Sequence, residues 1–464
     1  MELKSLDEIG HAAAAMAAGH QDALDRLVWT GVFGPEPMRA AARNAVLDQA
    51  RASGVYPASI HELYVARGRG DVPSNFTVPA VNIRGAAYDT ARALFRARLA
   101  LDAGPVICEI ARSEITYTDQ RPEEYVFVLL AAALREGWTG PVFVQGDHFQ
   151  ISAKKYAADP VAELQAVKEL TAEGIAAGFY NIDIDTSTLV DLDQKTLEQQ
   201  QATNGELCAE LTAFIRAHEP QGVTVSVGGE IGEVGGKNST PEELHAFMKV
   251  YQAALARLAP GKPGISKISI QTGTSHGGIP LPDGTIAKVN VDFDAIQNLS
   301  KLARERYHMG GAVQHGASTL PADLFDRFAK LGAVEIHLAT EFQNMLFDHP
   351  RFPAELKREI YEKLRTAAAD ERKASDTDEQ FFYKTRKKAL GLYKREIWGI
   401  APDAREAIRA TLQQKFEFLF GMLALKGTRA LAAQYAPFMP SAFPMPGQGV
   451  TAGRGPEDVS GLSD

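Results

Sequence analysis

Three histidines stand in short motifs that favour a shared metal site. His148 lies in GDHFQ, His276 in GTSHGG and His315 in VQHGAST. Neutral imidazoles combined with carboxylates form a ligand set that suits Zn²⁺. The glycine after His276 and after His315 removes a side chain and lets a substrate approach the backbone. The sequence therefore predicts one divalent ion, Zn²⁺, bound by these three imidazoles.

Carboxylates accompany the histidines. Asp147 directly precedes His148, Asp185 ends the segment NIDID, and Glu230 ends VGGE. A carboxylate beside a metal-bound histidine can contact a substrate oxygen without coordinating the metal ion. Asp147 is therefore predicted to be catalytic. Asp185 and Glu230 suit either a metal site or the capping of exposed backbone N–H groups. The other polar residues at the same kind of position are Asn82, Glu109, His337 and Thr340.

The remaining histidines are expected to be ordinary hydrogen-bonded residues. A lone histidine outside a cluster is more often structural than chemical. This expectation covers His11, His20, His61, His218, His245, His308 and His349.

The reactive residues end short β-branched segments that alternate with longer amphipathic ones. This alternation is typical of parallel strands joined by crossover helices, and eight such strands close a (β/α)8 barrel. In that fold the active site lies where strands end and the following loops begin. The predicted strands are 77–83, 105–110, 141–147, 179–185, 223–230, 267–272, 311–316 and 333–338.

The flanking regions predict further parts of the chain. We expect a helical extension over residues 1–70, the catalytic barrel over 71–350, and long charged helices over 351–430. Residues 431–464 are rich in Pro, Gly and Ser and are expected to be extended or disordered.

Composition excludes several classes of protein. The 49 Lys and Arg against 58 Asp and Glu give a formal charge of -9, which argues against nucleic-acid binding. Cys108 and Cys208 are far apart, so neither a disulfide framework nor a thiolate zinc site is indicated. No stretch approaches the roughly 18 apolar residues of a membrane span, and no signal peptide is apparent. A cytoplasmic location is expected.

Taken in order, the strand-end motifs resemble the class II, zinc-dependent fructose-bisphosphate aldolase family. Each motif alone is weak, but their order at successive strand ends is specific. The motifs are VPAVN ending at Asn82, GDH ending at His148, NIDID ending at Asp185, GGEIGEVGG over 228–236, SHGG around His276, QHGAS around His315 and VEIHLAT ending at Thr340.

The resemblance implies roles for individual residues. His148, His276 and His315 would hold Zn²⁺, with Asp185 and Glu230 near an alternative or second metal position. Asp147 would be the acid that protonates the aldehyde oxygen. The phosphate of the dihydroxyacetone phosphate half would be cradled by Gly277, Gly316, Ser318 and Thr340, and further substrate contacts would come from Asn82 and His337.

The resemblance also implies an arginine from a late helix that holds a second phosphate, often across a dimer interface. Arg395 in KREIW is the best match and Arg405 in PDAREAI the next, although a solvated helix face fits either. The expected assembly is a homodimer or homotetramer.

The sequence departs from the family pattern at the base that works on the enediolate carbon. The usual glutamate after the paired glycines is replaced by Lys237 and Asn238. Neither side chain is a natural base near neutral pH. Glu233, in the same glycine-rich segment, is favoured over His337 as the replacement. That segment is interpreted as a flap over the substrate rather than a plain surface turn.

The expected reaction is reversible cleavage of fructose 1,6-bisphosphate to dihydroxyacetone phosphate and glyceraldehyde 3-phosphate, as in glycolysis and gluconeogenesis. Three alternatives stay open. The first is an aldolase for another ketose such as tagatose 1,6-bisphosphate, because the extensions resemble the long subunits that accompany tagatose-bisphosphate aldolases. The second is a non-catalytic barrel that supports a partner aldolase. The third is a metal-dependent hydrolase.

Overall fold

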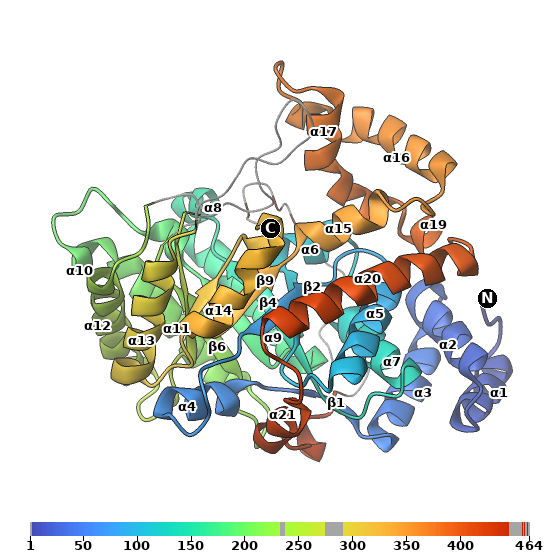
Figure 1. The fold of residues 1–464 in the computed structure, drawn as a ribbon, viewed down its shortest axis with the longest axis horizontal. Coiled ribbons are helices and arrows are strands. Elements are labelled where there is room, and N and C mark those ends of the chain that lie inside the picture. The colour runs from blue at the N-terminus through green and yellow to red at the C-terminus, as the bar shows by residue number, and fades with distance from the viewer. Residues whose placement is uncertain are drawn as a thin grey trace.

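The centre of the chain is a closed barrel of eight parallel strands (Figure 1). The computed structural model describes residues 2–232, 237–273, 291–444, 457, 459 and 462. Each strand pairs with the next, and the last pairs with the first through Val78 and Glu335. The predicted (β/α)8 fold is confirmed. Its strands are β2 (Val78–Asn82), β3 (Ile107–Ala111), β4 (Gly140–Gln150), β5 (Asn181–Asp185), β6 (Ser226–Glu230), β7 (Lys267–Ile270), β8 (Ala312–Gln314) and β9 (Glu335–Leu338).

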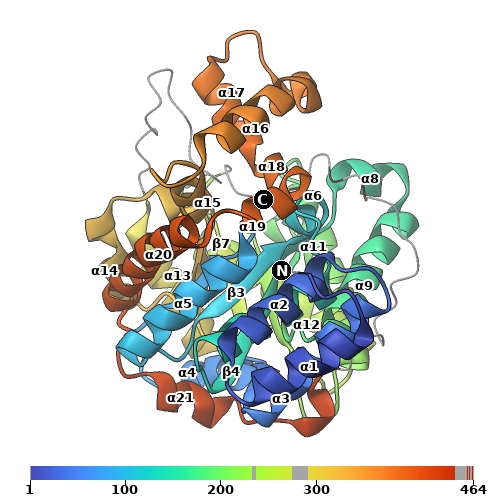
Figure 2. The same cartoon turned by 90° about the vertical axis from the view of Figure 1, so that its right-hand side faces the viewer.

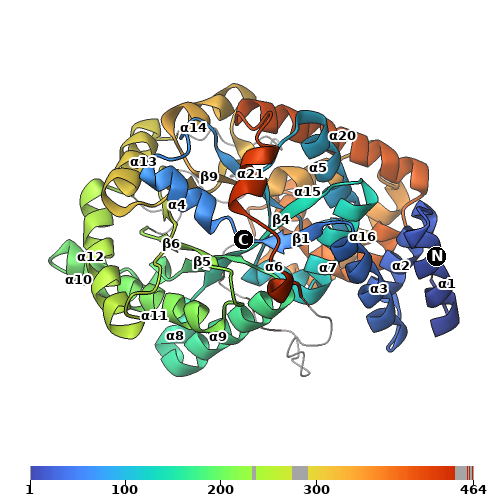
Figure 3. The same ribbon diagram turned by 90° about the horizontal axis from the view of Figure 1, so that it is seen from below.

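Helices surround these strands on all sides, as the view from below shows (Figure 3). The strands are therefore buried on both faces, so the polar residues that alternate with isoleucine in β5 (NIDID) and β7 (KISI) are buried inside the barrel as well. The surrounding helices are α5 (Ala87–Leu101), α7 (Pro122–Arg135), α9 (Pro160–Ala177), α11 (Ala202–His218), α12 (Pro241–Leu258), α13 (Phe293–Tyr307), α14 (Phe325–Leu331) and α20 (Pro402–Met422).

Helix α20 completes this ring although it lies far along the chain from β9. It packs against α5, and Arg409 and Arg405 both pair with Asp89 of that helix. The residue after α20, Leu423, accepts a hydrogen bond from the N–H of Thr77 just before β2. The end of the ring is thus attached to its beginning.

The N-terminal region consists of helices and one additional strand. Helices α1 (Leu6–Ala17), α2 (Gln21–Phe33) and α3 (Met38–Ala52) stack beside α7, and α4 (His61–Arg69) lies below the barrel (Figures 1 and 3). Strand β1 (Val55–Ala58) pairs with the first half of β4. The sequence did not predict β1, because four residues that include a proline are a weak strand signal.

A second group of helices projects from the end of the barrel where α6 (Arg112–Tyr117) and α15 (Thr340–Phe347) follow their strands (Figures 1 and 2). It contains α16 (Ala354–Ala367), α17 (Asp378–Thr385), the short helix η5 (Arg386–Lys388), α18 (Ala389–Leu392) and α19 (Lys394–Trp398). These helices stand between β9 and α20, so they form an insertion at the carboxyl-end face of the barrel. No helix in the described part of the chain has the length and apolar character needed to span a membrane.

Candidate active site

A bulge in β4 brings Asp147 and His148 into the barrel together. Between Gly146 and Phe149, β4 advances three residues while β5 advances two, from Ile182 to Ile184. His148 has a φ of 39°, a left-handed conformation that is uncommon for a non-glycine residue. Bulges re-aim side chains and occur often beside active sites. Here two consecutive residues, which would face opposite sides of a regular strand, are both buried.

His148 meets two carboxylates from neighbouring strands. Its Nδ1 lies 3.3 Å from Oδ2 of Asp185 on β5 and 3.8 Å from Oε2 of Glu230 on β6. All three side chains are buried, and the donor atoms of this His148 cluster lie within 4.8 Å of one another. Ser187 fixes Asp185 by donating from its backbone N–H and its hydroxyl. The structure therefore brings together three of the predicted metal-site residues.

The charges in the His148 cluster favour a bound cation. Burial and the charge of Asp185 raise the pKa of Glu230 well above its usual range. Burial also opposes ionisation of Asp185, but the hydrogen bond and charge of His148, together with hydrogen bonds from Gln150 and Ser187, outweigh it and lower the pKa of Asp185. Two carboxylates in one buried site repel each other unless a proton or a metal ion lies between them. The mixed nitrogen and oxygen donor set fits a divalent ion such as Zn²⁺.

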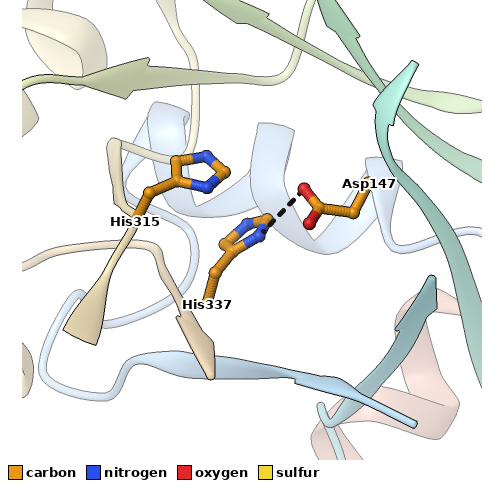
Figure 4. Close-up of side chains that lie close together, drawn as sticks. All are labelled: Asp147, His315 and His337. Atoms are coloured by element: carbon orange, nitrogen blue, oxygen red, sulfur yellow. Dashed lines mark ion pairs between the residues drawn. The ribbon is translucent and has the colours of Figure 1, made fainter. Parts of the chain in front are cut away.

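A second group, Asp147, His315 and His337, lies beside the first (Figure 4). Oδ1 of Asp147 lies 3.2 Å from Nδ1 of His337, the ion pair drawn in Figure 4. The ring centroids of His315 and His337 are 4.0 Å apart, and those of His148 and His315 are 4.5 Å apart. The imidazoles of β4, β8 and β9 thus form a row across the barrel mouth.

His337 is held by carboxylates on both ring nitrogens. Its Nδ1 also lies 3.0 Å from Oε2 of Glu109, and its Nε2 lies 2.8 Å from Oε1 of Glu335. Burial opposes the charged form, but Glu109 and Asp147 outweigh it and raise the pKa of His337 well above its usual range. These carboxylates therefore favour the protonated form of His337.

Sequence reasoning missed the layer of charges below His337. Lys267, on β7, lies 2.8 Å from Asp183 and 2.5 Å from Glu335, and it is completely buried. Asp183 and Glu335 precede the predicted residues Asp185 and His337 by two positions. Residues two apart face the same side of a strand, so this spacing was the signal that could have found them.

Asp183, Glu335 and His337 also have the spacing of a metal site, but Lys267 already supplies a cation there. Among the described residues, the His148 cluster is therefore the better candidate for a metal.

The predicted substrate-binding residues of β2, β8 and β9 lie at the rim of the same barrel end. Asn82 donates from Nδ2 to Glu114, and its buried Oδ1 has no hydrogen-bond partner among the described residues. Gly316 has a φ of 68°, which suits glycine directly after His315. Oγ of Ser318 accepts from the N–H of Ala339, next to Thr340 at the start of α15.

Other predicted residues are placed differently. His276, Gly277 and Glu233 lie outside the described residues. Arg395 is half-exposed and lies against α2, where Nη2 donates to the carbonyl of Phe33. Within one chain, Arg395 does not lie at the rim of the barrel.

The two residues that replace the usual flap base have partners of their own. Lys237 pairs with Glu243, and Asn238 donates to Asp292. Neither contact involves the described site.

The comparison with known families shows to which family the chain belongs. The family described as fructose-bisphosphate aldolase class-II matches residues 73–421, from just before β2 to the end of α20. This chain belongs to that family. The class II aldolase match covers all eight strands and the inserted helices, so the predicted family is confirmed. A comparison with curated proteins finds no match.

Several solved structures are similar to this class II aldolase, and the first of the three that follow shares its fold. One described as a probable tagatose 6 phosphate kinase from Sinorhizobium meliloti 1021 is 17% identical, with a TM-score of 0.54 over 77% of this chain and 99% of that one. A fructose-bisphosphate aldolase from Campylobacter jejuni is 17% identical, with a TM-score of 0.44 over 83% and 94%. The YdjI aldolase of Escherichia coli K12 is 14% identical, with a TM-score of 0.39 over 74% and 98%.

The family membership supports an aldehyde-lyase that acts on a ketose phosphate. The clusters in the barrel provide residues able to hold a divalent metal.

Proposed function

We propose that this class II aldolase is a zinc enzyme that reversibly cleaves fructose 1,6-bisphosphate to dihydroxyacetone phosphate and glyceraldehyde 3-phosphate. The observation that carries the proposal is the His148 cluster, a buried imidazole with two carboxylates, directly beside Asp147 at the carboxyl ends of the strands. Such a cluster can bind a metal and leaves Asp147 for proton transfer.

The metal would be held by His148, His315 and the predicted ligand His276, and Asp185 and Glu230 beside His148 would provide an alternative or second metal position. A bound divalent ion supplies Lewis-acid stabilisation of the negative charge that develops on the ketose oxygens when the carbon–carbon bond breaks. The chain itself supplies the donors, their burial and their orientation. Ser187 and Gln150 both donate to Asp185 and so fix one of these donors.

Asp147 is proposed to move the proton at the aldehyde oxygen. In cleavage its carboxylate accepts the proton of the ketose hydroxyl, and in condensation it returns that proton to the aldehyde. Burial disfavours the ionised form, but the positive charges of protonated His148 and His337 outweigh it and lower the pKa of Asp147 well below its usual range. A metal ion held by neutral His148 would supply positive charge at the same place. Asp147 is therefore expected in its ionised form, which is the form that can accept a proton.

The geometry of His337 favours Glu233 as the base that works on the enediolate carbon. A base must be able to take up a proton, and the carboxylates of Glu109, Asp147 and Glu335 favour the protonated form of His337, which cannot. Glu233→Gln is expected to stop solvent deuterium exchange into dihydroxyacetone phosphate while metal binding is retained. Exchange at the wild-type rate in this variant would show that another group is the base.

The proposed substrate is tested by a coupled assay of the zinc-loaded protein on fructose, tagatose and sedoheptulose bisphosphates. Cleavage of fructose 1,6-bisphosphate with the highest kcat/KM supports the proposal. A preference for tagatose 1,6-bisphosphate would show that the proposed substrate is wrong and that the proposed type of reaction is right. No cleavage of any of the three by fully metal-loaded protein would favour the non-catalytic barrel subunit.

A further inference from the structure

A cavity opens at the end of the barrel opposite the candidate active site. It lies between the end of α4, the loop over residues 70–74 and the end of α13. These two helices lie side by side on the underside of the barrel (Figure 3), and each ends before a strand begins. The cavity has a volume of about 580 Å³, which is within the range of small-molecule sites in proteins.

Basic side chains dominate the lining of this cavity. Arg67 and Arg69 stand in the last turn of α4, Arg304 stands in the last turn of α13, and His308 follows α13 directly. Glu305 is the one carboxylate among the described residues of the lining, and it lies 3.9 Å from the exposed Lys301. Within the described part of the chain, none of the three arginines forms an ion pair.

Two of these guanidiniums are held together despite their mutual repulsion. Nη2 of Arg67 and Nη1 of Arg304 both donate to the carbonyl of Gly332, at 3.0 and 2.7 Å. Burial, followed by the charge of Arg304, lowers the pKa of Arg67 to about 9. Burial also lowers the pKa of Arg304, although the charge of Glu305 opposes this shift. Both arginines stay charged near neutral pH, so a bound anion would relieve the repulsion.

Some N–H groups of these arginines have no partner. Arg67 is buried, yet its Nε has no hydrogen-bond partner among the described residues. In the same part of the chain, Arg304 donates only through Nη1, and the exposed side chain of Arg69 makes no hydrogen bond. Buried polar groups are normally hydrogen-bonded, so an unpartnered N–H beside a cavity indicates a bound group that supplies the acceptor.

The two helix ends do not neutralise the positive charge of the lining. The C-terminus of a helix carries about half a negative charge, so α4 and α13 together offset roughly one cation. Glu305 offsets one more. With His308 counted as neutral, the three guanidiniums leave an excess of about one positive charge. The planar fork of a guanidinium matches the oxygens of phosphate, which it binds through paired hydrogen bonds.

We propose that this cavity binds a phosphate group through Arg67, Arg69 and Arg304, either as inorganic phosphate or as part of a phosphorylated small molecule. The cavity is larger than a phosphate ion requires and has room for an attached organic group. The site lies at the opposite end of the barrel from the His148 cluster, so it does not depend on the proposed function.

Calorimetric titration of the full-length protein tests the site, with inorganic phosphate, ribose 5-phosphate and uncharged ribose as probes. Arg304→Gln should weaken binding of both phosphates by about tenfold, as expected when a charge-assisted hydrogen bond is lost. Arg69→Gln should weaken it by about threefold, because an exposed cation contributes less. Ribose should not bind measurably. Arg306→Gln, the matched control, removes an equal charge from the same turn of α13 outside the lining and should change binding by less than about twofold.

Binding of phosphate at the candidate active site would form a second class of sites that these substitutions leave unchanged. Tighter binding of ribose 5-phosphate than of inorganic phosphate would identify a phosphorylated small molecule as the ligand. Equal or weaker binding would identify free phosphate, and either result supports the site.

Three results would overturn the site: no phosphate binding by the wild type, wild-type affinity in both Arg69→Gln and Arg304→Gln, or an equal loss in Arg306→Gln. Arg304 also holds the carbonyl of Gly332, so circular dichroism and the melting temperature must show that Arg304→Gln is folded. If that variant does not fold, Arg69→Gln decides alone, because the Arg69 side chain makes no hydrogen bond or ion pair within the described part of the chain.

Discussion

At the scale of single residues, the bulge in β4 decides which side chains meet. Sequence motifs predicted Asp147 and His148 as neighbours with different roles, and the structure buries both at the same barrel end. The motifs did not reveal how many charges lie beneath them. Asp183 and Glu335 were overlooked because they stand inside strands, where an apolar residue is the usual expectation.

The His148 cluster should lose metal when either kind of donor is removed. We expect His148→Ala and Asp185→Asn to lower the zinc content of purified protein to well below one ion per chain, because each variant removes a donor from a site that needs about four. Atomic absorption after dialysis measures this content. His245→Ala, an exposed histidine that contacts Tyr307, is the control and should keep its metal. Full zinc occupancy in both donor variants would show that the His148 cluster does not bind the metal.

At the scale of elements, all eight barrel strands were predictable because β-branched segments recur between amphipathic helices. The strand that precedes the barrel was less predictable. Strand β1 escaped notice because it is short and contains Pro57, and its position beside β4 depends on Asn181, which bridges the two strands by hydrogen bonds to Ala58 and Val144. Such a contact depends on residues far apart in the sequence, and no local pattern reveals it.

Lys267 on strand β7 pairs with two buried carboxylates in the interior of the barrel. Lys267→Met should lower the free energy of unfolding by roughly 3–5 kcal/mol, because it leaves Asp183 and Glu335 buried without their cation. The melting temperature should fall clearly below that of the wild type. Lys249→Met, which removes an exposed pair with Glu198, should change stability by less than about 1 kcal/mol. Equal melting temperatures for the two variants would show that the buried pairs contribute little.

At the scale of the whole molecule, segments from both ends of the chain complete the barrel. The N-terminal helices cover α7, and α20 returns from the insertion to close the ring beside α5. The sequence indicated helices on both sides of the barrel but not their positions, because helix docking is set by tertiary packing rather than by periodicity. Helices α16–α18 lie at the carboxyl-end face of the barrel, the same end as the candidate active site.

The most direct test of the account is the metal dependence of fructose 1,6-bisphosphate cleavage, followed through the release of dihydroxyacetone phosphate. We expect the purified protein to lose activity when a chelator removes its metal and to regain it when stoichiometric Zn²⁺ is added. Asp147→Ala should keep its metal and lose at least about 100-fold in kcat, the usual contribution of a general acid or base. Cleavage that persists in metal-free protein, or in Asp147→Ala at the wild-type rate, would contradict the account.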